Sequence, residues 1–149
     1  MSLRELVAKA KLKGRKGRRL DVKEIRRIKR KGYKAERELV KKLRFHGFKS
    51  IRVPVSAPSN ESLPDVFAVK GDCLLAFEVK APKSGRAYFQ RRQVAKLFNF
   101  LDIFEAYPRR IAVLCAKFPR KWVLKTVDKP DDYVICRDEE SNIRLEKFT

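Results

Sequence analysis

The sequence predicts an α/β fold in which a central mixed β-sheet is flanked by helices. Short apolar runs with strand character recur between residues 65 and 136, and helical segments with an apolar stripe lie before and between them. The chain has 149 residues, 44% of them hydrophobic, which suits one domain with its own core.

The first helix is expected over residues 33–46, with Gly47 ending it. Its apolar stripe includes Leu39 and Leu43, and Glu36 lies on that same stripe. An acid on the buried face of a helix is costly unless it is paired or bound to a metal ion. Glu36 is therefore a candidate functional residue.

A β-hairpin is expected next, with strands at residues 65–69 and 73–80 and a turn that contains Gly71. Glycine tolerates the positive φ that such a turn needs. Both strands are predominantly apolar, which is typical of strands that are buried on both faces.

The hairpin brings Asp65, at the start of one strand, close to Glu78, near the end of the next. Side chains alternate along a strand, so Glu78 and Lys80 project from the same face. Two neighbouring carboxylates repel each other, and a Mg²⁺ ion relieves that repulsion because it prefers carboxylate and water oxygens. A cross-strand ion pair on a solvated sheet face is the alternative interpretation of the same spacing.

The remaining elements complete the sheet. Residues 87–106 are expected to form a long helix, either deeply buried or with part of its apolar surface in a dimer interface. Strands are expected at residues 110–117, 121–127 and 133–136, and the acidic segment at residues 130–132 is interpreted as a turn.

Charge indicates the class of partner. The formal net charge is +20, so a polyanion such as nucleic acid is the expected partner.

No apolar stretch approaches the roughly 20 residues that span a bilayer, and the N-terminus has no apolar signal core. Cys73, Cys115 and Cys136 fit no zinc motif and are expected to be reduced core residues. We therefore expect no membrane association and a cytoplasmic location.

The basic charge is concentrated near the N-terminus. Residues 1–31 hold fourteen Lys or Arg against three acids, and residues 11–19 are the densest part. Residues 20–28 are expected to form a short helix. We expect residues 1–30 to be a basic extension, either a flexible arm that grips phosphates or an added helical element, and residues 31–149 to be the main domain.

Seven motifs occur in order between residues 31 and 127: Lys31-Gly32, Ala35-Glu36-Arg37, His46-Gly47-Phe48, Arg52-Val53-Pro54-Val55-Ser56, Pro64-Asp65, Glu78-Val79-Lys80 and Tyr88-x-x-Arg91-x-Gln93. In this order they resemble the archaeal Holliday junction resolvases, which belong to the PD-(D/E)xK nuclease superfamily. The resemblance implies a restriction-endonuclease-like core. The basic segment ahead of Lys31 is a departure from the family, whose members usually begin near that lysine.

The resemblance also implies roles for individual residues. Asp65, Glu78 and Glu36 would bind Mg²⁺, with Mn²⁺ able to substitute, Lys80 would be the catalytic lysine, and Ser56 and Gln93 would support the site. From the residues alone, Ser59 or Ser62 could take the place of Ser56, and Gln93 could instead lie at the edge of the core. The side chains expected to hold the DNA backbone are Lys31, Arg37, Arg52, Lys83, Arg86, Arg91 and Arg92.

The sequence thus predicts a Mg²⁺-dependent endonuclease that resolves four-way DNA junctions as a homodimer, since a two-fold dimer supplies two equivalent sites. One alternative is a nuclease of the same superfamily with another DNA target, which a panel of substrates would separate. The other is a catalytically silent nucleic-acid-binding protein. The cluster of Glu36, Asp65 and Glu78 argues against it, because a binder gains nothing from acids near phosphate.

Overall fold

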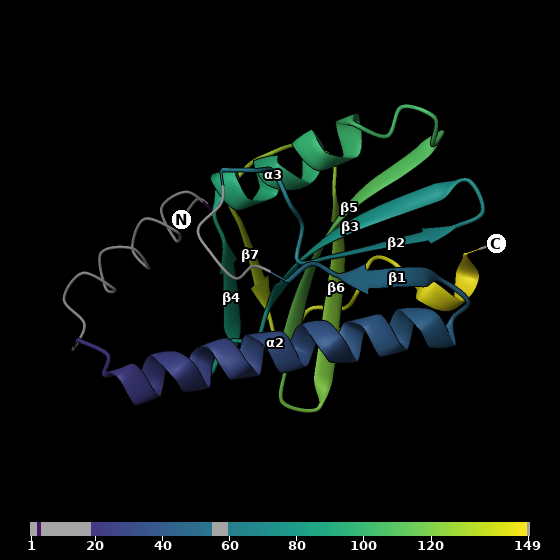
Figure 1. The fold of residues 1–149 in the computed structure, drawn as a ribbon. Helices are drawn as coiled ribbons and strands as arrows, with labels where there is room; N and C mark the ends of the chain where they lie inside the picture. Colours follow the sequence, from purple (N-terminus) through teal and green to yellow (C-terminus); the bar gives the residue numbers. More distant parts are fainter. Residues whose placement is uncertain (1–2, 4–18, 55–59, 149) are drawn as a thin grey trace.

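The structure, a computed structural model, describes residue 3 and residues 19–54 and 60–148 (Figure 1). Its elements, in chain order, are α2 (Val22–Phe45), β1 (Lys49–Arg52), β2 (Val66–Lys70), β3 (Cys73–Lys80), β4 (Arg86–Phe89), α3 (Arg91–Asp102), β5 (Arg109–Phe118), β6 (Lys121–Val127), β7 (Tyr133–Cys136) and a 3-10 turn at Leu145–Lys147. The predicted mixed α/β architecture is confirmed.

The main sheet has the strand order β1-β2-β3-β5-β6, and β4 pairs with β7 in a separate two-stranded sheet. Strands β3 and β5 are parallel, while the other neighbours in the main sheet are antiparallel. Helix α2 covers one face of this sheet and α3 covers the other (Figure 1). Strand β3 lies in the middle, so both of its faces are buried, as its apolar sequence indicates.

Helix α2 ends as predicted but begins much earlier. Asp21 caps its N-terminus in a capping box with Glu24, and Gly47, with φ of +84°, follows its C-terminus. The predicted helices at residues 20–28 and 33–46 are therefore parts of one helix. Gly32 does not break it, because a single glycine in a helix interior costs only about 1 kcal/mol relative to alanine. The predicted boundary between residues 30 and 31 falls inside α2.

The predicted hairpin is confirmed. Lys70 lies opposite Cys73 at its tip, where Gly71 adopts a φ of +57°. At the other end of the hairpin Val66 lies opposite Phe77. This register sets the start of β2 beside the end of β3.

The helix predicted over residues 87–106 is wrong at both ends. Residues Arg86–Phe89 form strand β4, which pairs with β7, and α3 runs only from Arg91 to Asp102. Ala87 and Phe89 are buried while Arg86 is exposed, which is the alternation of a strand. The apolar residues of this short strand continue directly into those of the following helix, so the sequence pattern does not separate the two elements.

The later strands lie at or within one residue of their predicted bounds. Cys73 and Cys115 are buried free thiols, in agreement with the prediction, and Cys136 is half-buried. Among the described residues, no helix is long and apolar enough to cross a membrane.

Candidate active site

Four charged side chains from one strand, one helix and one loop end meet at one edge of the sheet. Asp65 directly precedes β2, Glu78 and Lys80 lie near the end of β3, and Glu36 lies on the buried face of α2. The hairpin register brings Asp65 beside Glu78, and α2 packs across both strands. The structure therefore brings together the two strand-borne acids and the lysine as the sequence predicts.

Asp65 is held in place by backbone hydrogen bonds across the hairpin. Its backbone N–H donates to the carbonyl oxygen of Phe77 over 3.0 Å, and its Oδ2 accepts from the backbone N–H of Val79 over 2.8 Å. The carboxylate is thus fixed relative to β3 by the main chain. That fixed position sets it beside Glu78.

Burial and mutual repulsion change the protonation of this acid pair. Burial, followed by the charge of Asp65, raises the pKa of Glu78 to about 8, although nearby Lys80 acts in the opposite direction. Burial also raises the pKa of Asp65, against the lowering effect of the Val79 N–H and of Lys80. The pair therefore holds a proton near neutral pH when no cation is bound.

Glu36 is 8% exposed and is paired with an arginine from β1. The Nε of Arg52 donates to its Oε2 over 2.6 Å, and the Arg52 guanidinium lies 4.5 Å from the centre of the Tyr33 ring. Burial and then the charge of Asp65 raise the pKa of Glu36, while Arg52 opposes that rise. Arg52, expected to face DNA, thus also has a partner inside the protein.

Asp65 and Glu78 have donor atoms that suit a hard divalent cation, while Glu36, the third predicted ligand, accepts a hydrogen bond from Arg52. Within residues 19–54 and 60–148 and at residue 3, no group of three or more His, Cys, Asp or Glu is placed to hold a metal ion. Asp65 and Glu78 form an adjacent pair that is unfavourable as two anions. Mg²⁺ is usually bound by one or two carboxylates together with substrate phosphate, so this pair suits it.

Two supporting residues were predicted, and one can be placed. Ser56 lies outside the described residues. Gln93 is half-buried in the first turn of α3, and its Oε1 accepts from the backbone N–H of Gln90 over 3.0 Å, so it caps that helix. Lys96, one turn further along α3, was not predicted, although its charge lowers the pKa of Glu78. Lys96 lies three residues after Gln93, and this spacing indicates that both side chains are on the same face of the helix.

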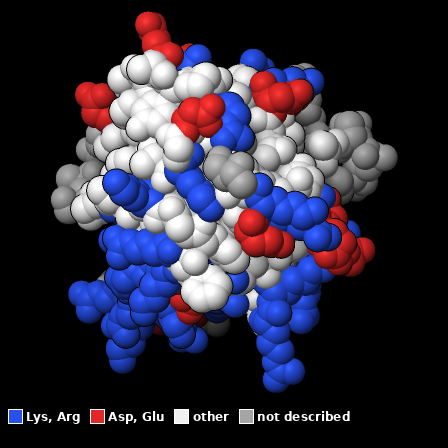
Figure 2. Space-filling view, turned by 90° about the vertical axis from the view of Figure 1, so that its right-hand side faces the viewer, with Lys and Arg blue, Asp and Glu red and all other residues white. Residues whose placement is uncertain are grey.

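The other predicted DNA-binding side chains lie on the outside of the molecule. Lys31 donates from its Nζ to the carbonyl oxygen of Pro82 over 3.4 Å, a contact that ties α2 to the segment after β3. The remaining five are Arg37, Lys83, Arg86, Arg91 and Arg92. Lys and Arg side chains gather on the lower part of the molecule in Figure 2, the side on which α2 lies in Figure 1. The dense basic run at residues 11–18 lies outside the described part of the chain.

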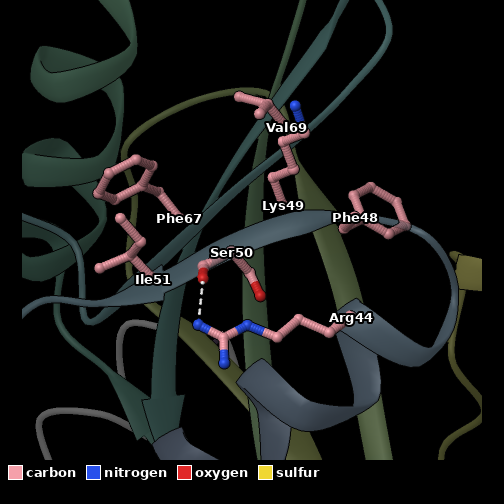
Figure 3. Close-up of a pocket in the computed structure, with 7 residues that line it drawn as sticks. All are labelled: Arg44, Phe48, Lys49, Ser50, Ile51, Phe67 and Val69. Carbon is pink, nitrogen blue, oxygen red and sulfur yellow. Dashed lines mark hydrogen bonds between the residues drawn. The ribbon is translucent and has the colours of Figure 1, made fainter.

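A separate cavity of about 420 Å³ lies at the β1 edge of the sheet and holds none of the site residues. Figure 3 shows Ile51 and Phe67 side by side, and the Arg44 guanidinium donates to the Ser50 carbonyl oxygen over 3.0 Å. The exposed fraction of Ile51 is 56%.

Comparison with known proteins places these features in a family. The model of the family described as "Archaeal holliday junction resolvase (hjc)" matches residues 27–149. The chain belongs to the archaeal Holliday junction resolvase family. The resemblance predicted from the seven motifs is therefore confirmed. The matched region includes all four charged residues of the site.

Other resolvases of this family are similar over most of the chain. A protein named crossover junction endodeoxyribonuclease Hje from Sulfolobus acidocaldarius is 38% identical over 117 residues, which are 78% of this chain and 83% of that protein. One of the same name from Saccharolobus solfataricus is 36% identical over 109 residues, or 72% and 79%.

The fold agrees with that of a solved resolvase. The structure of Hjc from Archaeoglobus fulgidus, described as a Holliday junction resolvase from an archaeal hyperthermophile, superposes with a TM-score of 0.60 at 29% identity. The match covers 70% of this chain and 88% of the other. The restriction-endonuclease-like α/β fold predicted from the sequence is thereby confirmed.

Proposed function

We propose that this protein is a structure-selective DNA endonuclease that cuts four-way junctions by Mg²⁺-dependent phosphodiester hydrolysis and acts as a homodimer. The observation that carries the proposal is the buried Asp65–Glu78 pair beside Lys80, in a chain with a net charge of +20 whose relatives are named crossover junction endodeoxyribonucleases. A basic protein that only binds DNA has no use for two acids at that position.

Asp65 and Glu78 would hold the divalent ion, which supplies Lewis-acid activation of water and neutralises charge on the phosphodiester. Glu78 must give up its proton for this, because its pKa lies near 8. Lys80 projects beside the pair, close enough to oppose the rise in the pKa of Glu78, and is positioned to stabilise charge on the transferred phosphoryl group. Mn²⁺ has the same preference for carboxylate oxygens and is expected to substitute.

Glu36 has a positioning role in this proposal. Its carboxylate is near enough to Asp65 and Glu78 to raise the pKa of the latter, yet it is bonded to Arg52. We assign to it the orientation of the attacking water from the α2 side, with Arg52 lowering the pKa of the carboxyl against the effect of burial. Glu36 and the exposed basic side chains of α2 are carried by one helix, which would set the distance between the carboxylate and bound DNA phosphate.

An apolar surface supports the homodimer. Ile51 is 56% exposed and lies opposite Phe67 on the neighbouring strand, whose ring centre is 5.3 Å from that of Phe100 in α3. Ile103, just after α3, is 71% exposed. Exposed apolar side chains of this kind are typical of protein interfaces. A two-fold dimer through this surface would present two catalytic sites to one junction.

The proposal is tested with an end-labelled synthetic four-way junction and a linear duplex of the same sequence, each with Mg²⁺ or with EDTA. We expect paired, symmetric nicks in the junction only, and only with Mg²⁺. Equal cutting of both substrates would leave a nuclease with another target. Tight binding without cutting would contradict the enzymatic proposal.

A further inference from the structure

A groove of about 340 Å³ lies between the N-terminal half of α2 and the segment that follows β3. Leu20 and Ile28 line it from the α2 side, and Ala81 and Pro82 line it from the other. Leu20 is 51% exposed and Ile28 is 47% exposed, so these side chains present apolar surface to solvent. The volume lies in the range of pockets for small ligands.

The described charged residues that line this groove are all cations. Arg27, Lys31 and Lys83 stand around the apolar residues, and no acid is among the described lining side chains. The hydrogen bond from Lys31 Nζ to the Pro82 carbonyl oxygen joins the two walls. An apolar surface surrounded by cations is complementary to a molecule with an apolar face and a phosphate.

The groove continues to the catalytic residues. A second groove, of about 420 Å³, shares Ile28, Ala81 and Pro82 with the first and is also lined by Lys80. The distance along the chain is short as well, because Ala81 and Pro82 directly follow Lys80. A DNA strand bound beside Lys80 would therefore lie within reach of these apolar side chains.

Gly32 gives an independent indication of a ligand. It lines the second groove from the interior of α2, where glycine is a poor helix former. A Cβ atom built at this position would have no described atom within 4 Å, so packing inside the protein does not require glycine. An open surface without a side chain allows the backbone of another molecule to approach α2 closely.

We propose that these joined grooves hold one unstacked nucleotide of the cut strand, adjacent to the scissile phosphate. Its sugar and base contact Ile28, Ala81 and Pro82, the strand passes over Gly32, and Lys31 and Lys83 bind its phosphate. The inference rests on the proposed function and deepens it by naming how the branch point is recognised.

A branch point is where such a nucleotide is available. Unstacking and unpairing a base costs a few kcal/mol in duplex DNA and least where stacking is already interrupted. Intact duplex presents mainly phosphates to a protein surface, and phosphates gain nothing from exposed Leu20 and Ile28. The apolar part of the groove therefore favours a junction over a linear duplex.

The cut positions are first mapped with wild-type protein and Mg²⁺. The fluorescent base 2-aminopurine is then placed on either side of the scissile phosphate, and its emission is measured with Ca²⁺ in place of Mg²⁺. We expect binding of the wild type to raise emission at one of the two positions by several-fold. I28Q should remove most of that rise and reduce the cleavage rate by at least tenfold.

Val22 provides the matched control, since it is exposed on the same helix and lines neither groove. V22Q should behave as wild type.

G32L should fill the groove and lower both the emission and the cleavage rate. Its melting temperature should stay the same or rise, because leucine is a strong helix former. Wild-type cleavage without an emission change, or unaltered emission with I28Q and G32L, would overturn the groove inference alone. Failure of the wild type to cut any junction would overturn the proposed function and this inference together.

Discussion

Arg52 and Glu36 form an ion pair of 2.6 Å between β1 and α2, and the guanidinium is held over the ring of Tyr33 at the same time. The Glu36 side chain is 11% exposed and that of Arg52 is 21% exposed. The pair thus has a structural role, in joining the edge strand to the helix, and an electrostatic one, because Arg52 opposes the rise in the pKa of Glu36 that burial and the charge of Asp65 cause.

Replacing Arg52 should destabilise the fold. We expect R52Q to lower the free energy of unfolding by roughly 1.5–3 kcal/mol, because Glu36 loses a charge-assisted hydrogen bond. Urea unfolding measures the change, and R30Q, at an exposed position of the same helix as Glu36, is the control. A decrease in R52Q no larger than that in R30Q would show that the ion pair adds nothing to stability.

The metal-free protein should lose stability as the pH rises. The folded state holds a proton on Glu78 up to a pKa of about 8, whereas the unfolded chain releases it near 4.5. The folded state therefore binds more protons in this window, and the free energy of unfolding falls as the pH increases from about 5 to about 8. Thermal unfolding in EDTA should show this fall in the wild type and a smaller one in E78Q. Identical pH profiles would contradict the raised pKa.

Glu78 should be required for cutting but not for binding. We expect E78Q to lower the cleavage rate by roughly 10²-fold or more, as found when one preorganised electrostatic group is removed from an active site. Junction affinity should stay the same or increase, since glutamine keeps the shape of the side chain and cannot carry a negative charge near phosphate. Gel-shift titration and single-turnover cleavage separate the two effects. Cleavage at the wild-type rate would remove Glu78 from the site.

The outer face of α2 should determine the salt dependence of binding. Replacing Lys23, Arg26 and Arg30 by glutamine is expected to flatten the slope of log affinity against log salt by about 0.9 for each phosphate that the protein no longer neutralises. The control replaces Arg109 and Lys125, which are paired with Asp72 and Glu139. Equal slopes for both variants would mean that DNA does not bind to this part of α2.

The exposed apolar side chains that include Ile51 and Ile103 should lie in the dimer interface. I103E places a charge at a side chain that is 71% exposed, so the folded monomer tolerates it while an interface does not. Light scattering after size exclusion should change from a dimer to a monomer, with paired junction nicks replaced by single ones. F45E is the control, because Phe45 is also exposed but lies at the end of α2. A dimeric I103E would move the interface elsewhere.

The acids can be located from the sequence because their local context is unusual. Glu36 interrupts an apolar helical stripe, and Asp65 and Glu78 are brought together by one short hairpin with Gly71 at its turn. Both signals depend on residues that are close along the chain and not on how distant segments pack. For this reason the predicted positions of these acids agree with the structure.

The features that were not predicted depend on packing between distant segments. Strand β4 has only four residues, and its partner β7 lies more than forty residues later, so its alternation is not distinguishable from the start of a helix. The pairing of Arg52 with Glu36 likewise depends on how β1 packs on α2, which no local pattern reveals. Lys96 shares the helical face of Gln93, which the sequence does show, but its nearness to Glu78 arises from the packing of α3 against β3.

Helix α2 has a mechanical consequence. It is unbroken from Val22 to Phe45, about 36 Å at 1.5 Å per residue, and Glu36 sits slightly beyond its midpoint. The basic first turns of α2, where a DNA arm would bind under the proposed function, and the Glu36 carboxylate therefore belong to one rigid helix. The helix would then fix how many nucleotides separate the bound phosphates from the cleaved bond. Lengthening or shortening α2 ahead of Glu36 would change that spacing and leave the catalytic residues in place.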